Sequence, residues 1–141
     1  MKKVLLASLT LVLVSCSSSL KPIGKKHLYE ILTQQSDGGA NIRFFEILSE
    51  PKEIVMLQND EKLKNKIQSS DVQNANFVVL NMGEKPTGGY QISVETVVET
   101  DKNIIITVKE TTPDANGMVI QALTTPYCIV KVNSKKEIII K

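Results

Sequence analysis

Few side chains of this sequence could take part in catalysis. The only histidine, His27, lies beside a polar stretch where no predicted strand fixes its geometry, and the two cysteines are Cys16 and Cys128. A nucleophile with a positioned histidine base cannot be assembled from these residues. One histidine and one free cysteine also fall short of the nitrogen and sulfur ligands that zinc requires. We therefore expect no enzyme activity, no metal site and no cofactor.

The carboxylates and glycines do not change this expectation. Glu84, Glu95 and Glu99 lack the spacing of paired catalytic carboxylates and are expected to face solvent. The TGGY segment at 87–90 precedes a run typical of a strand, whereas a phosphate-binding glycine loop opens a helix.

The beginning of the chain predicts export. Lys2 and Lys3 precede an apolar run from 4 to 14, and small Ser15 follows that run. This is the pattern of a secretory signal peptide, here residues 1–15. The run is also shorter than the about 20 apolar residues that a membrane-spanning helix needs.

The segment LVSC at 13–16 resembles the bacterial lipobox. That resemblance implies cleavage before Cys16 and attachment of acyl chains to this residue. Several chains anchor a protein stably, whereas one chain alone is marginal. In a bacterium with two membranes, the resemblance also implies that Ser17, where an Asp would retain the protein, favours the outer membrane. An ordinary signal peptide followed by a coincidental cysteine is the alternative.

Charge and composition limit the possible partners. The chain has 17 Lys and Arg residues, of which two leave with the signal peptide, so 15 basic residues face 15 acidic ones. No stripe of basic and aromatic residues is present, and we expect no nucleic-acid partner. Only 4% of the residues are aromatic, so Val, Ile and Leu must fill the core of a single domain of modest size.

A short tether is expected between the anchor and the folded domain. Residues 16–27 include the polar SSSLKPIGKK stretch, which Pro22 and Gly24 interrupt. The domain is then expected over 28–141. Within it, runs rich in Val, Ile and Thr predict short strands. These runs lie at 28–35, 42–50, 77–83, 90–99, 103–111, 127–133 and 137–141.

The expected fold class is mainly β (α+β), an antiparallel sandwich or barrel-like domain with one short helix. Residues 100–102 and 134–136 predict tight hairpins. The helix is expected at 60–66, because Asn59 is a good N-cap and the acidic residues precede the basic ones. Leu63 and Ile67 would then share its buried side.

Cys128 lies in the alternating run PYCIVKV. If Cys16 carries lipid, Cys128 has no partner within the chain. A buried small hydrophobe is the simpler interpretation, and a reactive or intermolecularly paired thiol is the alternative.

The turn before the strand at 90–99 is unusually specific. Pro86 fixes φ, and Gly88 and Gly89 can adopt positive φ, so the turn can reach conformations that are closed to other residues. Tyr90 then enters the strand with a large ring. In a purely structural interpretation, the turn is tight and Tyr90 plugs the end of the sandwich.

The segment FVVLNMGEKPTGGYQISVETV and the later TTPYCIVKV resemble the C-terminal domain of the protease complex subunit PrcB family. The resemblance covers about 77–132 and depends on two motifs, PTGGY at 86–90 and TPY at 125–127. It implies an envelope lipoprotein or secreted accessory protein. In the system that gave the family its name, the protein partners and stabilises a surface protease.

A looser similarity concerns chagasin-like inhibitors of cysteine proteases, which have an immunoglobulin-like fold. They carry three loops in the same chain order as KPTGGY, PDANGM (113–118) and TPY, and this similarity implies a wedge that enters a protease cleft. The residues that differ from the inhibitor pattern are Lys85, Gly88, Thr125 and Tyr127.

These observations predict a lipid-anchored envelope protein whose β domain binds a protease or another envelope protein and stabilises or regulates it. The alternatives are a chagasin-like inhibitor, a structural lipoprotein without a protease partner, and a small-ligand binder with a pocket beneath two tyrosines. We expect the two motif turns to lie side by side and to form the recognition surface. Its residues would be Pro86, Thr87, Gly88, Gly89, Tyr90, Thr125, Pro126 and Tyr127.

Overall fold

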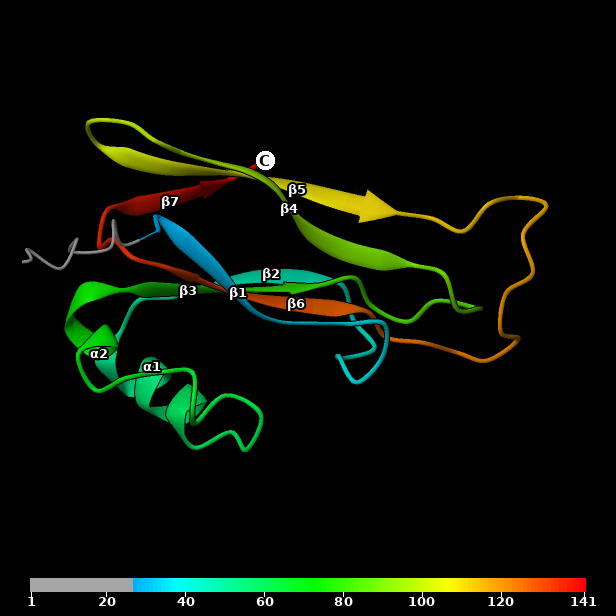
Figure 1. The fold of residues 1–141 in the computed structure, drawn as a ribbon, viewed down its shortest axis with the longest axis horizontal. Helices are drawn as coiled ribbons and strands as arrows, with labels where there is room; N and C mark the ends of the chain where they lie inside the picture. The colour runs from blue at the N-terminus through cyan, green and yellow to red at the C-terminus, as the bar shows by residue number, and fades with distance from the viewer. Residues whose placement is uncertain (1–26) are drawn as a thin grey trace, which may run out of the picture.

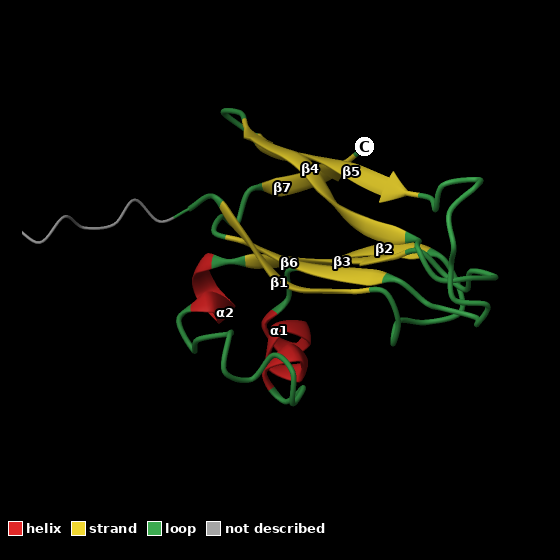
Figure 2. Cartoon of the chain, turned by 45° about the vertical axis from the view of Figure 1, so that its right-hand side comes forward, coloured by secondary structure: helices red, strands yellow, loops and turns green. Residues whose placement is uncertain are grey.

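The computed structural model describes residues 27–141, in which two β-sheets and a pair of short helices form three layers (Figures 1 and 2). The signal peptide, Cys16 and the predicted tether before His27 lie outside the described residues. The elements are β1 (Tyr29–Gln35), β2 (Phe44–Leu48), α1 (Pro51–Gln58), α2 (Asp71–Asn74), β3 (Asn76–Asn81), β4 (Gln91–Glu99), β5 (Asn103–Thr111), β6 (Tyr127–Val132) and β7 (Glu137–Ile140).

The middle layer is an antiparallel sheet in the order β1-β6-β3-β2. One of its faces packs on the second sheet, β4-β5-β7, and the other packs on the helices (Figure 2). The central strand β6 is therefore buried on both faces, which explains why its sequence is almost continuously apolar.

Side chains of β6 alternate between two cores. Cys128, Val130 and Val132 belong to the core between the sheets, the inter-sheet core, together with residues such as Leu80 and Ile106. Tyr127 and Ile129 point the other way, into the helix-side core. The main side chains of the helix-side core are Leu32, Leu48, Ile54, Leu63, Ile67 and Phe77.

The mainly β fold class is confirmed, and the expected strands lie close to their predicted bounds. The two sheets do not close into a barrel. The prediction of a hairpin at 100–102 is also confirmed, because β4 and β5 pair antiparallel across that turn.

The prediction of a hairpin at 134–136 is wrong. The chain leaves β6 and crosses to the other sheet, where β7 pairs parallel with β5 and Ile104 lies opposite Ile138. Alternation of apolar residues predicts that a strand has a buried face, but it does not identify the neighbouring strand. The second sheet is therefore mixed, whereas an all-antiparallel arrangement was expected.

The helix prediction is also wrong in place and in number. Helix α1 begins at Pro51, where a missing N–H costs nothing, and the Glu53 carboxylate accepts the backbone N–H of Glu50 at 3.0 Å. Asn59 ends this helix instead of starting another. Residues 60–66 form successive turns, in which Asp60 accepts the N–H of Lys62 at 2.8 Å.

The burial expected for Leu63 and Ile67 is nevertheless confirmed, since both lie in the helix-side core. A second short helix, α2, was not predicted. Among the described residues, no helix combines the length and apolar character needed to cross a bilayer.

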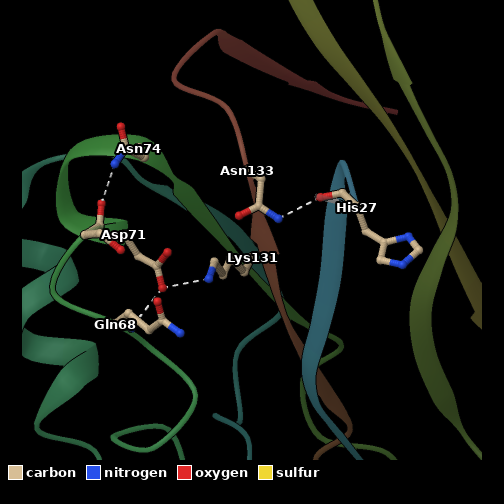
Figure 3. Close-up of polar contacts among 7 residues, drawn as sticks. His27, Gln68, Asp71, Asn74, Lys131 and Asn133 are labelled. Carbon is tan, nitrogen blue, oxygen red and sulfur yellow. Dashed lines mark hydrogen bonds and ion pairs between the residues drawn. The ribbon is translucent and has the colours of Figure 1, made fainter. Parts of the chain in front are cut away.

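A buried ion pair joins the helix layer to the middle sheet (Figure 3). Lys131 of β6 lies on the helix side of its strand, and its Nζ is 2.7 Å from Oδ2 of Asp71, the first residue of α2. The two side chains are only 9% and 2% exposed. The same carboxylate oxygen accepts the backbone N–H of Gln68 at 2.8 Å, so the segment before α2 is fixed as well.

Candidate functional site at the loop end

Three connections meet at one end of the domain, which we call the loop end. They are residues 36–43, 82–90 and 112–126, and they lie together on the right of Figures 1 and 2. His27 precedes β1 at the opposite end, where the chain enters the described part (Figure 2). The two predicted motif turns therefore lie at the loop end, as expected.

Backbone hydrogen bonds hold the PTGGY turn against the segment before β6. Lys85 and Thr124 exchange two of them, at 2.8 Å and 3.0 Å. The N–H of Gly88 donates to the carbonyl of Ile120 at 2.9 Å, and the hydroxyl of Thr124 donates to the carbonyl of Thr87 at 2.8 Å. The prediction that the turns lie side by side is thus confirmed.

The two glycines of the turn have different roles. Gly89 has a φ of 87°, and a Cβ added there would lie 2.7 Å from Cβ of Pro113. Only glycine fits this position without strain, and it lets the third loop approach closely. Gly88 does not have positive φ, and its nearest side-chain neighbour, Cβ of Ile120, would be 3.5 Å from an added Cβ.

Thr125 holds the first loop in place. Its backbone N–H and its hydroxyl donate to Oδ1 of Asp37 at 3.0 Å and 2.9 Å, and its own oxygen atoms accept the N–H groups of Gly38 and Gly39. The Thr125 hydroxyl, followed by the backbone N–H groups of Thr125 and Gly38, holds the pKa of Asp37 below its ordinary value. Thr125 thus has a structural task at the base of the loop end.

Asn81 fixes the same loop from the end of β3. Its Oδ1 accepts the N–H of Ala40 at 3.0 Å, and its Nδ2 donates to the carbonyls of Ala40 and Ile42 at 2.8 Å and 2.6 Å. The side chain is almost fully buried. The first loop is therefore anchored at both of its sides, which leaves the side chain of Ile42 projecting outward, 76% exposed.

The two tyrosines of the motifs face inward. Tyr90 is half-buried and packs against the inter-sheet core, with Nζ of Lys85 5.8 Å from its ring centroid. This position agrees with a plug at the end of the sandwich. Tyr127 is 8% exposed and belongs to the helix-side core, where its hydroxyl accepts a long bond from Nζ of Lys62. Pro126 is buried too, so the TPY motif offers little surface to a partner.

The most exposed apolar side chains of the loop end lie outside both motifs. Met118, Ile120 and Leu123 are fully exposed, 75% exposed and 64% exposed, and Ile42 adds a fourth. Ile120 is also the residue that bonds Gly88, so this apolar patch adjoins the PTGGY turn. The run GMVIQAL at 117–123 could have indicated the patch, because an apolar run that forms no strand has no core to enter.

The described residues contain no cluster of side chains suited to a metal ion. Exposed His27 begins the described chain at the end opposite the loop end (Figure 2). Its carbonyl accepts the Asn133 amide at 2.7 Å (Figure 3). Cys128 is fully buried, and desolvation raises the pKa of its thiol to about 11, as suits a small hydrophobe rather than a reactive thiol.

Hollows beside the loop end are open and lined by other residues. One of them, about 370 Å³, is bordered by Gln34, Gln35, Ser36 and Gln91. Neither motif tyrosine borders it. A ligand pocket beneath Tyr90 and Tyr127, one of the sequence-based alternatives, therefore has no support from this hollow.

Comparison with known proteins identifies the segment that carries both motifs. The family described as PrcB C-terminal matches residues 76–133, which run from β3 through β6. They include the PTGGY turn and all of the apolar patch except Ile42. No curated protein and no solved structure matches the chain. Residues 76–133 of this chain belong to the PrcB C-terminal family.

Proposed function

We propose that this protein is a lipid-anchored envelope protein whose loop end binds another protein and stabilises or regulates it. The observation that carries the proposal is the apolar patch of Ile42, Met118, Ile120 and Leu123. Exposed apolar side chains gathered at one end of a domain, beside a tight turn, are typical of protein interaction sites. The backbone carbonyls of Ile42 and Ile120 accept hydrogen bonds from Asn81 and Gly88, so these two residues lose little backbone entropy on binding.

A protease, or a peptide segment of one, is the partner class that we propose. The support is membership of residues 76–133 in the PrcB C-terminal family, which takes its name from a subunit of a protease complex. The position of the patch agrees with this role. The described chain begins at the end opposite the loop end (Figure 2), so an anchor at Cys16 would leave the patch free to meet a partner.

The structure favours a docking module over a chagasin-like inhibitor. The first two candidate loops do touch, because Gly89 lies against Pro113. The third would have to present Tyr127, which is buried in the helix-side core. A three-loop wedge would therefore lack its third edge.

Affinity capture from detergent-solubilised envelopes tests the proposal. The test variant carries Met118→Ser, Ile120→Ser and Leu123→Ser, and the control variant carries Val98→Ser and Ile139→Ser, which are exposed apolar positions on the second sheet. We expect wild type and control to retain one envelope protein, identified by mass spectrometry, that the test variant loses. Loss of an interface hot spot costs about 2 kcal/mol or more, roughly thirtyfold in affinity.

Equal capture by all three proteins would contradict the proposal. If the test and control variants both fail to capture the partner, the loss is not specific to the apolar patch, and the proposal that this patch is the binding surface would be contradicted. If nothing is captured by wild type, the alternative of a structural lipoprotein without a protein partner is favoured.

A further inference from the structure

Strand β2 leaves one edge of the middle sheet open. It pairs only with β3, and among the described residues no backbone hydrogen bond forms on its other side. Two other edge strands are interrupted by irregular pairing, β1 between Ile31 and Thr33 and β4 between Val94 and Thr96. The remaining edge strand, β7, is regular but has only four residues. Such interruptions protect an edge against strand addition, and β2 has none.

An apolar groove runs beside this open edge. A hollow of about 240 Å³ lies between β2 and α1, and its lining is mostly apolar. Leu48 and Leu57 border it from the strand and the helix, and Met56 stands over it with 73% of its surface exposed. A groove between an edge strand and a helix can accept an extended peptide, whose backbone pairs with the strand while alternate side chains enter the groove.

The polar border of the groove is acidic. Glu46 and Glu53 line it, and neither forms an ion pair with a described residue. Glu53 is held in position because one of its oxygens accepts the N–H groups of Ser49 and Glu50, each at 3.0 Å. A peptide in this groove would therefore be favoured by a basic side chain.

A second copy of this chain fits the edge poorly. Glu46 is the central residue of β2, so a two-fold antiparallel pairing of two β2 strands over their full length places Glu46 opposite its own copy. Like charges directly opposite each other destabilise a strand pair. The same position favours a partner strand with Lys or Arg there.

We propose that the groove between β2 and α1 binds an extended peptide with a basic residue and, two positions away, an apolar residue. The peptide adds to the sheet as a strand beside β2. Its basic side chain lies against Glu46 and Glu53, and its apolar side chain packs on Leu48, Met56 and Leu57, because residues two apart share one face of a strand. This surface is distinct from the apolar patch of the loop end.

Amide and methyl NMR spectra of the detergent-solubilised full-length protein, titrated with the capped peptide TVKTLVT, test this proposal. We expect shifts at 44–48 and at the Met56 methyl, but not at Met118. The control peptide TVETLVT should bind about two- to fivefold more weakly, as for an exposed ion pair. In a strand, alternate backbone N–H groups point to opposite sides, so only one set can donate to β2. N-methylation of that set should weaken binding of the peptide about tenfold.

Two variants complete the test. Glu46→Lys should reverse the preference, so that TVETLVT binds better than TVKTLVT. Met56→Ala should weaken both peptides, whereas Met118→Ala, which removes the same side chain at the loop end, should weaken neither. Absence of shifts in β2, equal binding of the two peptides or indifference to N-methylation would overturn the proposal.

Discussion

Neighbouring residues of one turn can differ sharply in what they tolerate. Gly89 combines a φ of 87° with a close approach to Pro113, whereas Gly88 has neither constraint. An L side chain in the left-handed region costs about 1–2 kcal/mol before any clash is counted. From sequence, the two glycines appeared equivalent, because a glycine's φ and the identity of its neighbour are set by tertiary structure.

We therefore predict that Gly89→Ala lowers the free energy of unfolding by about 2 kcal/mol or more and that the matched variant Gly88→Ala changes it by less than about 1 kcal/mol. Urea denaturation followed by circular dichroism measures both values. Equal losses in the two variants would show that the φ and the contact with Pro113 do not govern the stability of this turn.

Asp37 makes stability depend on pH. Its bonds with Thr125 and with the N–H of Gly38 place the pKa of the carboxyl in the folded protein below its ordinary value of 3.8. The stabilisation is therefore fully present above the ordinary pKa and is lost as the pH falls through the lower folded value. We predict that wild type exceeds Asp37→Asn in melting temperature at pH 7 and that the difference shrinks below about pH 4. Melting curves at several pH values check this, and a difference that grows in acid would contradict it.

At the scale of elements, the strands could be predicted and their partners could not. Alternating apolar residues in β4 and β5, and nearly continuous ones in β3 and β6, indicate strands with one or two buried faces. Which sheet receives β7 depends on contacts between distant segments, and no local pattern records them. The helix was misplaced because Asn59 can both end a helix and begin one, and the capping by Glu53 that decides between these roles is visible only in three dimensions.

The ion pair between Asp71 and Lys131 allows a test of how strongly α2 is coupled to β6. Both groups are desolvated, so removal of one partner leaves a buried charge, at a cost of about 3–5 kcal/mol. We predict losses of this size for Asp71→Asn and for Lys131→Met measured singly. The double variant should lose less than the sum of the two. Urea denaturation of all four proteins forms a double-mutant cycle, and additive losses would show that the pair does not couple α2 to β6.

For the whole molecule, the sequence indicated the end of the domain that bears the candidate site but not the side chains that form its surface. The PTGGY and TPY motifs meet at the loop end as expected. Their tyrosines face inward, however: Tyr90 packs against the inter-sheet core, and Tyr127 belongs to the helix-side core. The exposed side chains at the loop end are instead Ile42 and apolar residues of the segment 112–126. A sequence motif predicts a turn well when it contains glycine and proline, because these residues limit the backbone conformations of the turn. Which side chains of a long loop are exposed depends instead on which of them pack into a core, and this is set by the tertiary structure.

The proposed lipid anchor can be tested separately from the fold. Cys16 lies in the segment that resembles a lipobox, while both cores are built from the described part of the chain. We predict that Cys16→Ser abolishes labelling by a fatty-acid analogue and moves the protein from the membrane fraction to the soluble fraction. The melting temperature of the domain should stay unchanged, because the substitution alters none of the described core side chains. Purified Cys16→Ser should still capture in solution the partner retained by wild type, since the loop end is intact. Equal labelling of wild type and variant would refute the anchor, whereas loss of labelling together with loss of capture in solution would show that binding requires the lipid as well as the loop end.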